Sequence, residues 1–352
     1  APRIGTGATD RHWHHGSALG LGFVLAPRTN RSFAATPDQS CPSPRLCSRD
    51  SPLRVKKRTI YRMLSDQQRD KFAAADGPSG PIREKERWES AAHAGEARIH
   101  YPASWYYFGS VDELRRQPVA KEILGKRLVG FVTESGQPGV LESRCVHMGS
   151  DLGRGCVVGE TLQCSLHNWR FATDGSCKEI PSSKQIPSFA KQVSYPAEIR
   201  HGSVFFYFGV EPRFPLPFFE GFSLDDFVVA PPFIEYLECP WYMIGANAVD
   251  VQHFSIAHDR RMQGKPDVTY PDSFAHRTVC HFEVAGQTWS DRVTRHFGGP
   301  DVRLQVTDWC STIIFARSTL AKTETFGIVS PVPLSPVTTM AHVTVMARPG
   351  AG

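Results

Sequence analysis

The sequence predicts an α+β fold, in which a small antiparallel β domain is followed by a domain with a curved antiparallel sheet and one helix. Short β-rich runs separated by turn signals begin near residue 104, a helical segment follows at Trp241–His258, and strand-like runs resume after it. The chain of 352 residues is 41% hydrophobic and 21% charged, which is the composition of a globular protein with a real core.

The charge of the chain is concentrated at its start. Residues 1–60 hold 10 Lys/Arg and 3 Asp/Glu, whereas the remaining residues hold 30 and 32. We therefore predict a disordered, targeting or non-native tail over residues 1–64, and no nucleic-acid surface on the folded part. We expect a cytoplasmic protein, or an organellar one if the tail is a transit peptide. No apolar run is long enough to span a bilayer.

Residues 65–99 are predicted to form a polar linker with one helix, because charged, helix-permissive residues are interrupted there by Gly-Pro pairs. The small β domain is predicted over residues 100–212. Its strands are expected at Ser104–Gly109, Arg127–Thr133, Gly139–Arg144, Thr161–Ala172 and Ser203–Gly209, with a turn at Asp174-Gly175.

A proline-rich crossing, Pro212–Pro217, leads into the second domain, predicted over residues 213–352. Five aromatic residues of this domain suit an apolar pocket or the core: Phe274, Phe282, Trp289, Phe297 and Phe315. After the helix, strands are expected at Val279–Val284, Trp289–His296, Val302–Trp309, Thr312–Ala316 and Thr338–Met346.

Four residues in two matching loops indicate a metal cluster. Cys145-Val146-His147 is followed, after sixteen residues, by Cys164-Ser165-Leu166-His167, so each loop offers one thiolate and one imidazole. In a Rieske [2Fe–2S] centre two Cys hold one iron and two His hold the other. Glycines after the first pair let the backbone fold close to the cluster sulfurs: Gly149, Gly153 and Gly155.

Two other interpretations of these residues are open. A zinc site also uses Cys and His, but its usual spacing pairs Cys with Cys and His with His. The residues could also be unrelated buried thiols and core histidines, although such residues would not fall into two matching loops. Cys156 and Cys177 lie nearby without ligand spacing, and we interpret them as structural thiols.

The stretches Cys145–Leu152 and Gln163–Phe171 resemble the Rieske domain of the non-haem iron aromatic-ring-hydroxylating oxygenases. They are most similar to the branch that contains steroid oxygenases, cholesterol desaturases and aminopyrrolnitrin oxygenase. Respiratory Rieske proteins add a disulfide between the two loops, where this chain has Ser150 and Leu166. The resemblance therefore implies the lower-potential oxygenase type of cluster.

A second metal site is predicted at His253 and His258, because two His and one carboxylate on one face of Fe(II) leave positions open for O₂ and substrate. Five residues of regular helix would place the two side chains about 140° apart. Both can reach one ion only if the helix ends or bulges between them.

The resemblance covers this segment too. It implies that His253 and His258 bind mononuclear iron, that Asp250 bridges to a cluster histidine across a subunit boundary in a homotrimer, and that Asn247 lies near the iron. The family's third ligand is an Asp on a helix after the last strands, and this chain has no acidic residue after Glu324. We therefore expect a catalytic domain whose C-terminal part, with the third ligand, is missing.

The resemblance implies a terminal oxygenase component. A reductase, with or without a ferredoxin, would take electrons from NAD(P)H to the cluster, and Asp250 would relay them to Fe(II), which activates O₂ against an apolar aromatic or steroid-like substrate. The alternative is an electron-transfer or non-catalytic partner subunit without a working mononuclear iron. The missing carboxylate favours this alternative, whereas the presence of Asp250, His253 and His258 favours the oxygenase.

Overall fold

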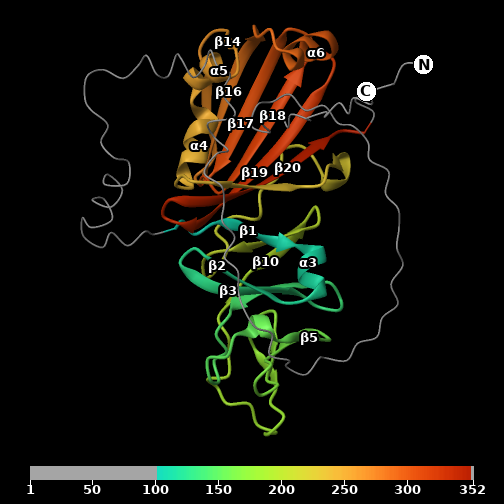
Figure 1. Cartoon of the computed structure of the whole chain (residues 1–352), viewed down its shortest axis with the longest axis vertical. Helices are drawn as coiled ribbons and strands as arrows, with labels where there is room; N and C mark the ends of the chain where they lie inside the picture. Colours follow the sequence, from blue (N-terminus) through green and yellow to red (C-terminus); the bar gives the residue numbers. More distant parts are fainter. Residues whose placement is uncertain (1–100, 350–352) are drawn as a thin grey trace, which may run out of the picture. The chain divides into compact units, whose positions relative to one another are not determined.

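The computed structural model describes residues 101–349, all of which belong to one compact unit (Figure 1). The predicted tail over residues 1–64 and the linker over residues 65–99 lie outside the described residues. Within the described part, the fold is mainly antiparallel β with a few helices, which confirms the α+β class. No helix among residues 101–349 is long and apolar enough to cross a membrane.

Two small sheets form the first part of the described chain. Their strands are rich in aromatic and β-branched residues with buried side chains, such as WYYFGS in β1 and SVFFY in β11, and this composition favours strands. One sheet has the order β1-β11-β10 and the other β2-β3-β4-β9. The strands are β1 Trp105–Ser110, β2 Val119–Ile123, β3 Lys126–Val132, β4 Pro138–Glu142, β9 Ser194–Tyr195, β10 Ala197–Arg200 and β11 Ser203–Tyr207.

A third small sheet, in the order β5-β6-β7-β8, carries one of the two Cys/His loops. Its strands are β5 Cys156–Val158, β6 Thr161–Gln163, β7 Arg170–Ala172 and β8 Cys177–Glu179. The prediction of one run over Thr161–Ala172 was wrong, because this segment is two strands with the loop between them. The predicted turn at Asp174-Gly175 is confirmed, since Gly175 takes a positive φ of 80° and closes the β7–β8 hairpin.

The second part is one nine-stranded antiparallel sheet. Its main path is β12-β20-β19-β18-β17-β16-β14, with β13 on β20 and β15 on β16. The expected strands of this part are found, apart from Trp289–His296, and they run longer than predicted. The strands are β12 Val228–Val229, β13 Phe233–Leu237, β14 Arg260–Met262, β15 Asp267–Asp272, β16 Ala275–Val284, β17 Asp301–Trp309, β18 Ile313–Leu320, β19 Glu324–Ser335 and β20 Thr338–Ala347.

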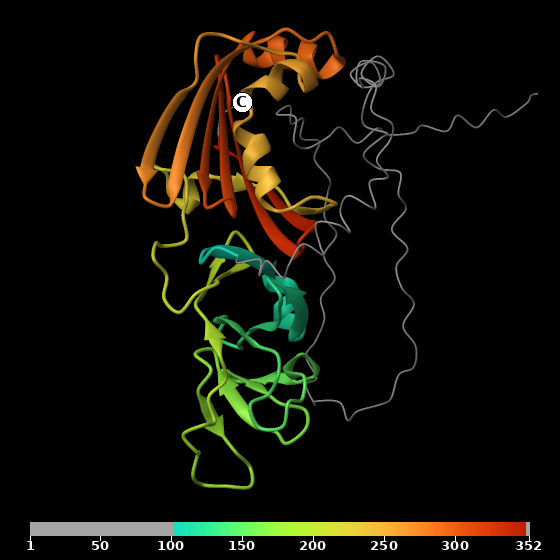
Figure 2. The same ribbon diagram turned by 90° about the vertical axis from the view of Figure 1, so that its left-hand side faces the viewer.

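The predicted helix Trp241–His258 is two helices that meet at Asp250, and Figure 2 shows them on one face of the large sheet. The strand predicted at Trp289–His296 was wrong, because this segment is a helix, and Asp291 accordingly lies on a helix. The helices are α3 Val111–Arg116, α4 Tyr242–Val249, α5 Val251–Ala257 and α6 Trp289–Gly298, with 3-10 turns at Leu152–Arg154 and Leu224–Asp226.

Two hydrophobic clusters fill the described part. The larger one joins aromatic residues of β1 and β11 to apolar residues of β18, β19 and β20, so the three-stranded sheet and the large sheet share a core. The smaller cluster packs around Cys145 and Cys164 with Phe131, Leu152 and Phe171. It anchors both Cys/His loops, because the first cysteine of each loop belongs to it.

Candidate metal centres

The two Cys/His loops are built in the same way. In the first loop, Cys145 N–H donates to Ser150 O at 2.8 Å and Gly149 N–H donates to Cys145 O at 2.8 Å. In the second, Cys164 N–H donates to Trp169 O at 2.8 Å and Asn168 N–H donates to Cys164 O at 3.0 Å. Each turn closes on a residue with positive φ, 73° at Gly149 and 58° at Asn168. The matching spacing in the sequence therefore corresponds to matching backbone turns.

The structure brings the four predicted ligands together as two like pairs. The thiols of Cys145 and Cys164 hydrogen-bond each other, and both residues are buried, at 3% and 2% exposure. The ring centroids of His147 and His167 lie 4.6 Å apart, nearer to solvent. A Rieske cluster needs this arrangement, with two thiolates on one iron and two imidazoles on the other. The residues present fit the cluster.

Hydrogen bonds around the sulfur of Cys164 favour negative charge there. The bond between the thiols raises the pKa of Cys145 and is the largest of the effects that lower the pKa of Cys164 to about 5. Backbone N–H groups of Leu166 and His167, and the hydroxyl of Ser150, also donate to the Cys164 sulfur and lower its pKa. The sulfur of Cys145 accepts from the backbone N–H groups of His147 and Met148, the corresponding positions in its own loop. Such donors stabilise thiolates and, with a cluster bound, its sulfur ligands.

Aromatic and apolar side chains surround the histidine end of the pair. The ring of His147 stacks on Trp169, with centroids 4.2 Å apart and planes 7° apart. Met148 and Leu166 are largely exposed beside the two imidazoles. Of the two other cysteines nearby, Cys177 is buried with its thiol donating to Glu179 O at 3.5 Å, and Cys156 is half-buried on β5.

Asp250 divides the predicted iron helix into two. Its N–H donates to Ala246 O at 3.1 Å, which ends α4, and its carboxylate Oδ1 accepts from Gln252 N–H at 3.0 Å, which caps the start of α5. Asp250 and Asn247 are both exposed. Among residues 101–349, no hydrogen bond joins either residue to a cluster histidine. The bridging role of Asp250 is therefore still a prediction.

His253 and His258 face each other at the end of α5. Their ring centroids lie 5.2 Å apart, and α5 ends at Ala257, so the helix stops between them as their spacing required. His253 Nδ1–H donates to Asp250 O, which leaves Nε2 free to bind a metal. Burial lowers the pKa of His258, and the neighbouring His253 lowers it further, so its ring is neutral as a ligand must be.

Within the described part of the chain, no group of three or more His, Cys, Asp or Glu side chains is arranged around one metal position. The Rieske ligands do not need such a group, because each iron takes only two protein side chains. His253 and His258, by contrast, lack a third protein ligand among residues 101–349. The two histidines fit one side of a mononuclear iron, and the carboxylate is not found there.

An ion pair that the sequence did not single out holds the backbone at His258. Arg260 Nη1 donates to His258 O at 2.8 Å and to Asp291 Oδ1 at 2.7 Å, and Asp291 is 4% exposed. Asp291 also belongs to the capping box of α6, since Thr288 N–H donates to its Oδ2 at 3.1 Å. The pattern Thr288-x-x-Asp291 was the available sequence signal for this anchor.

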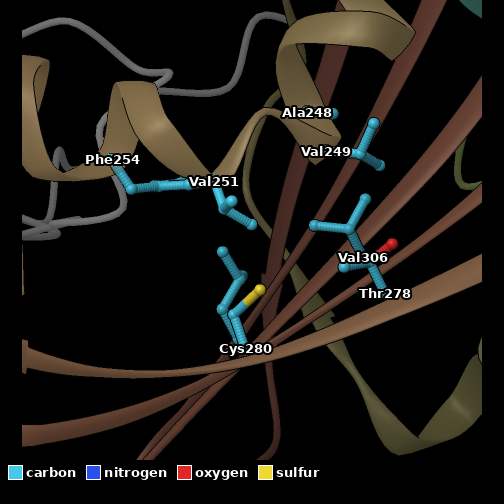
Figure 3. Close-up of a pocket in the computed structure, with 8 residues that line it drawn as sticks. Ala248, Val249, Val251, Phe254, Thr278, Cys280 and Val306 are labelled. Carbon is cyan, nitrogen blue, oxygen red and sulfur yellow. The ribbon is translucent and has the colours of Figure 1, made fainter. Parts of the chain in front are cut away.

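An apolar gap with no room for a water molecule lies between the two iron-site helices and the large sheet (Figure 3). Phe254, the residue next to His253, lines it from α5. None of the five aromatic residues considered from the sequence lines it, and Phe282 and Phe315 are instead buried in the sheet. The gap is lined by Ala248, Val249, Val251, Phe254, Thr278, Cys280, Leu304 and Val306.

Comparisons with known proteins agree with this geometry. The Rieske [2Fe-2S] domain family matches residues 104–190. The chain is 31% identical over 180 residues to the oxygenase component of 3-ketosteroid-9-alpha-monooxygenase from Rhodococcus rhodochrous, a match that covers 47% of this chain and 45% of that protein. It is 29% identical over 187 residues to cholesterol 7-desaturase nvd of Xenopus laevis, covering 51% and 41%. The chain thus spans less than half the length of these curated relatives.

Solved structures share the fold over a longer stretch. Dicamba monooxygenase bound to dicamba has a TM-score of 0.57 at 16% identity, covering 71% of this chain and 77% of that one. The QL mutant of NdmA from Pseudomonas putida CBB5, with caffeine, has a TM-score of 0.55 at 19% identity, covering 70% and 74%. At these identities the likeness establishes the fold alone, and it extends well beyond the residues of the Rieske domain.

Proposed function

We propose that this chain, which belongs to the Rieske oxygenase family, is a terminal oxygenase component. Cys145, His147, Cys164 and His167 would hold a [2Fe–2S] cluster, and His253 with His258 would hold a mononuclear Fe(II). When bound, the cluster supplies single electrons and the iron offers open positions for O₂. The reaction class is the oxidation of an apolar aromatic or steroid-like substrate.

The observation that carries this proposal is the presence of two different candidate metal sites in one chain. A pure electron carrier has no use for two facing histidines at the end of a helix, with Nε2 of His253 left free by its bond to Asp250 O. The apolar side chains packed between the two helices and the sheet support a substrate without charge. Phe254 and Thr278 belong to this apolar packing, on α5 and β16.

The residues of this chain have separate tasks in such a reaction. The sulfur-directed N–H groups of the two loops would stabilise the cluster ligands. Asp250 O would fix the tautomer of His253, and burial would keep His258 neutral and able to bind iron. The apolar side chains packed between α5 and the sheet would help to exclude water from the iron site.

The names of the relatives support the partners and the substrate class. Two are called an oxygenase component or an oxygenase subunit, which supports a separate reductase, with or without a ferredoxin, that draws on NAD(P)H. Their named substrates are a ketosteroid and tert-butanol, and a third relative is a cholesterol desaturase, so all are weakly polar or apolar molecules. A homotrimer, with Asp250 as the bridge between subunits, belongs to the same proposal.

The test is a count of iron and acid-labile sulfide in anaerobically purified protein. We expect about three irons and two sulfides per chain. His253→Ala and His258→Ala should each lose one iron and keep the sulfide, whereas Cys145→Ala should lose the cluster. His281→Ala, at an exposed histidine of β16, is the control and should keep every iron. A wild-type chain without iron or sulfide would contradict the proposal.

A second candidate function has its own support. The absence of a third ligand beside His253 and His258 among residues 101–349 favours an electron-transfer or partner subunit without a working mononuclear iron. For such a protein the same measurement should give about two irons and two sulfides. The iron count should then be unchanged in His253→Ala and His258→Ala, which separates the two candidates.

A further inference from the structure

We infer that Gln192 is a positioning residue of the cluster, because its side chain closes the first ligand loop and holds the backbone on both sides of Cys145. Gln192 lies beyond the residues that match the Rieske family, and the Cys/His motif gives no hint of it. The inference rests on the cluster part of the proposed function and does not depend on iron at His253 and His258.

Three hydrogen bonds define the contact. Gln192 Oε1 accepts from Val146 N–H at 3.0 Å, and Gln192 Nε2 donates to Glu142 O and to Arg144 O, each at 2.6 Å. The amide orientation is unambiguous, because a backbone N–H can only donate and a carbonyl can only accept. Gln192 is 3% exposed, so water does not compete for these bonds.

The bond to Val146 completes the first loop. Cys145 N–H and Gly149 N–H pair within the loop, and the N–H groups of His147 and Met148 point to the Cys145 sulfur. Val146 N–H is the amide between two ligands, and its partner comes from 46 residues further along the chain. A buried N–H without a partner is costly, so without Gln192 the loop must shift to find another one.

The position of Gln192 is itself fixed by a tight turn. Its N–H donates to Gly175 O at 2.8 Å, in the turn between β7 and β8. Gly175 has a φ of 80°, and a Cβ there would lie 2.0 Å from Gln192 O, so only glycine allows this approach. The third sheet therefore supports the first ligand loop through Gln192, as well as carrying the second loop directly.

Within residues 101–349, no glutamine side chain holds the backbone of the second loop in this way, and Gln163 beside that loop supplies a matched control. Gln163 directly precedes Cys164, but its side chain bonds the side chains of Asn168 at 3.3 Å and Arg170 at 2.9 Å. Among the described residues, it makes no side-chain bond to the backbone of a ligand loop. Gln163→Leu therefore removes a glutamine beside the cluster without freeing a backbone group at Cys145 or His147.

The experiment compares Gln192→Leu with Gln163→Leu in the full chain with its cluster. We expect Gln192→Leu to lose its iron to a chelator about 10–100-fold faster than wild type, as is typical when a residue that orients a metal ligand is removed. Its electron paramagnetic resonance spectrum after reduction should also change, because Cys145 and His147 move. Gln163→Leu should match wild type in both measurements. A role in fold stability alone would leave the spectrum unchanged.

A second variant keeps the inference testable if Gln192→Leu does not fold. Gln192→Glu keeps the size and the acceptor for Val146 N–H, and it loses the donors to Glu142 O and Arg144 O. We expect faster iron loss and an altered spectrum here too. A wild-type spectrum and wild-type iron loss in Gln192→Glu, or in folded Gln192→Leu, would overturn the inference. A wild-type chain without any cluster would instead contradict the proposed function.

Discussion

Single hydrogen bonds distinguish the two halves of the cluster site. Both sulfurs receive backbone N–H groups, but only Cys164 also receives the hydroxyl of Ser150. Donors to cluster sulfurs stabilise the more negative, reduced form, and they therefore raise the reduction potential. Ser150 stands where respiratory Rieske proteins have a disulfide cysteine. In this chain, that position therefore places a hydroxyl donor, and not a disulfide, beside the sulfur of Cys164.

Replacing Ser150 by Ala should lower the reduction potential of the cluster. The loss of one hydrogen bond of about 1 kcal/mol corresponds to about 40 mV for a one-electron couple. A redox titration followed by visible circular dichroism measures this shift. Ser183→Ala, at an exposed serine whose hydroxyl donates to Gln185 O, is the control. An unchanged potential in Ser150→Ala would mean that the hydroxyl does not act on the cluster.

At this scale, the sequence predicted what lies in a local pattern and missed what does not. Cys145, His147, Cys164 and His167 follow one spacing rule, and the structure brings them together as like pairs. Gln192 follows no such rule, because its role depends on a turn in another hairpin and on atoms 46 residues away. The missing carboxylate beside His253 and His258 was noticed from the sequence, and the described residues do not supply it.

Among the secondary-structure elements, the helix α6 is the clearest error of the sequence prediction. Its β-branched and aromatic residues, such as Trp289, Val293 and Thr294, favoured a strand. The capping box at Thr288 and Asp291, and Gly299 with a φ of 93° at the other end, are helix boundary signals that outweigh this composition. In this segment, the helix-capping residues predicted the structure better than the strand propensity of the residues between them.

The same cap links α6 to the proposed iron site, and this link gives a testable prediction. Asp291→Asn removes the charge that holds Arg260, and Arg260 in turn holds His258 O. We expect the affinity of the histidine pair for Fe(II) or Co(II) to fall by about 10–100-fold, as measured by titration calorimetry. Burial raises the pKa of Asp291, and its bonds to Thr288 and Arg260 outweigh that effect, so the group is charged at neutral pH.

The control for this prediction is Glu324→Gln, which disrupts a comparable ion pair with Arg317 on β18 and β19. Its metal affinity should equal that of wild type, and circular dichroism should show that both variants are folded. Equal metal affinity in Asp291→Asn and wild type would show that the ion pair does not position His258. If the wild-type chain binds no metal at His253 and His258, the iron site itself is wrong.

In the molecule as a whole, the three-stranded sheet and the nine-stranded sheet share buried contacts that cross the predicted domain boundary at residue 212. Ser104 Oγ and Thr312 Oγ1 lie 2.7 Å apart, and Ser203 Oγ lies 3.2 Å from His342 Nε2. Tyr107 stacks on His342 with centroids 3.9 Å apart. Periodicity within a strand indicates which side chains are buried, but not which distant sheet covers them, so the sequence did not predict this junction.

His342 makes the stability of this junction depend on pH. The residue is 2% exposed, and burial lowers its pKa to about 4, below the usual value near 6.5. Between these values the unfolded chain binds a proton that the folded chain excludes. The folded state is therefore fully stabilised above about pH 6.5, and it loses stability as the pH falls towards 4. The difference between the two pKa values corresponds to at most about 3 kcal/mol.

Urea unfolding of the wild type and of His342→Gln, between pH 7.5 and pH 5, measures this effect. The free energy of unfolding should fall more steeply with decreasing pH in the wild type, because the variant has no group to protonate there. Other groups, such as His201, whose pKa burial also lowers, contribute equally to both proteins, and their effect cancels in the comparison. Parallel curves for the two proteins would mean that His342 takes up its proton without unfolding the junction, which burial against Tyr107 and Ser203 argues against.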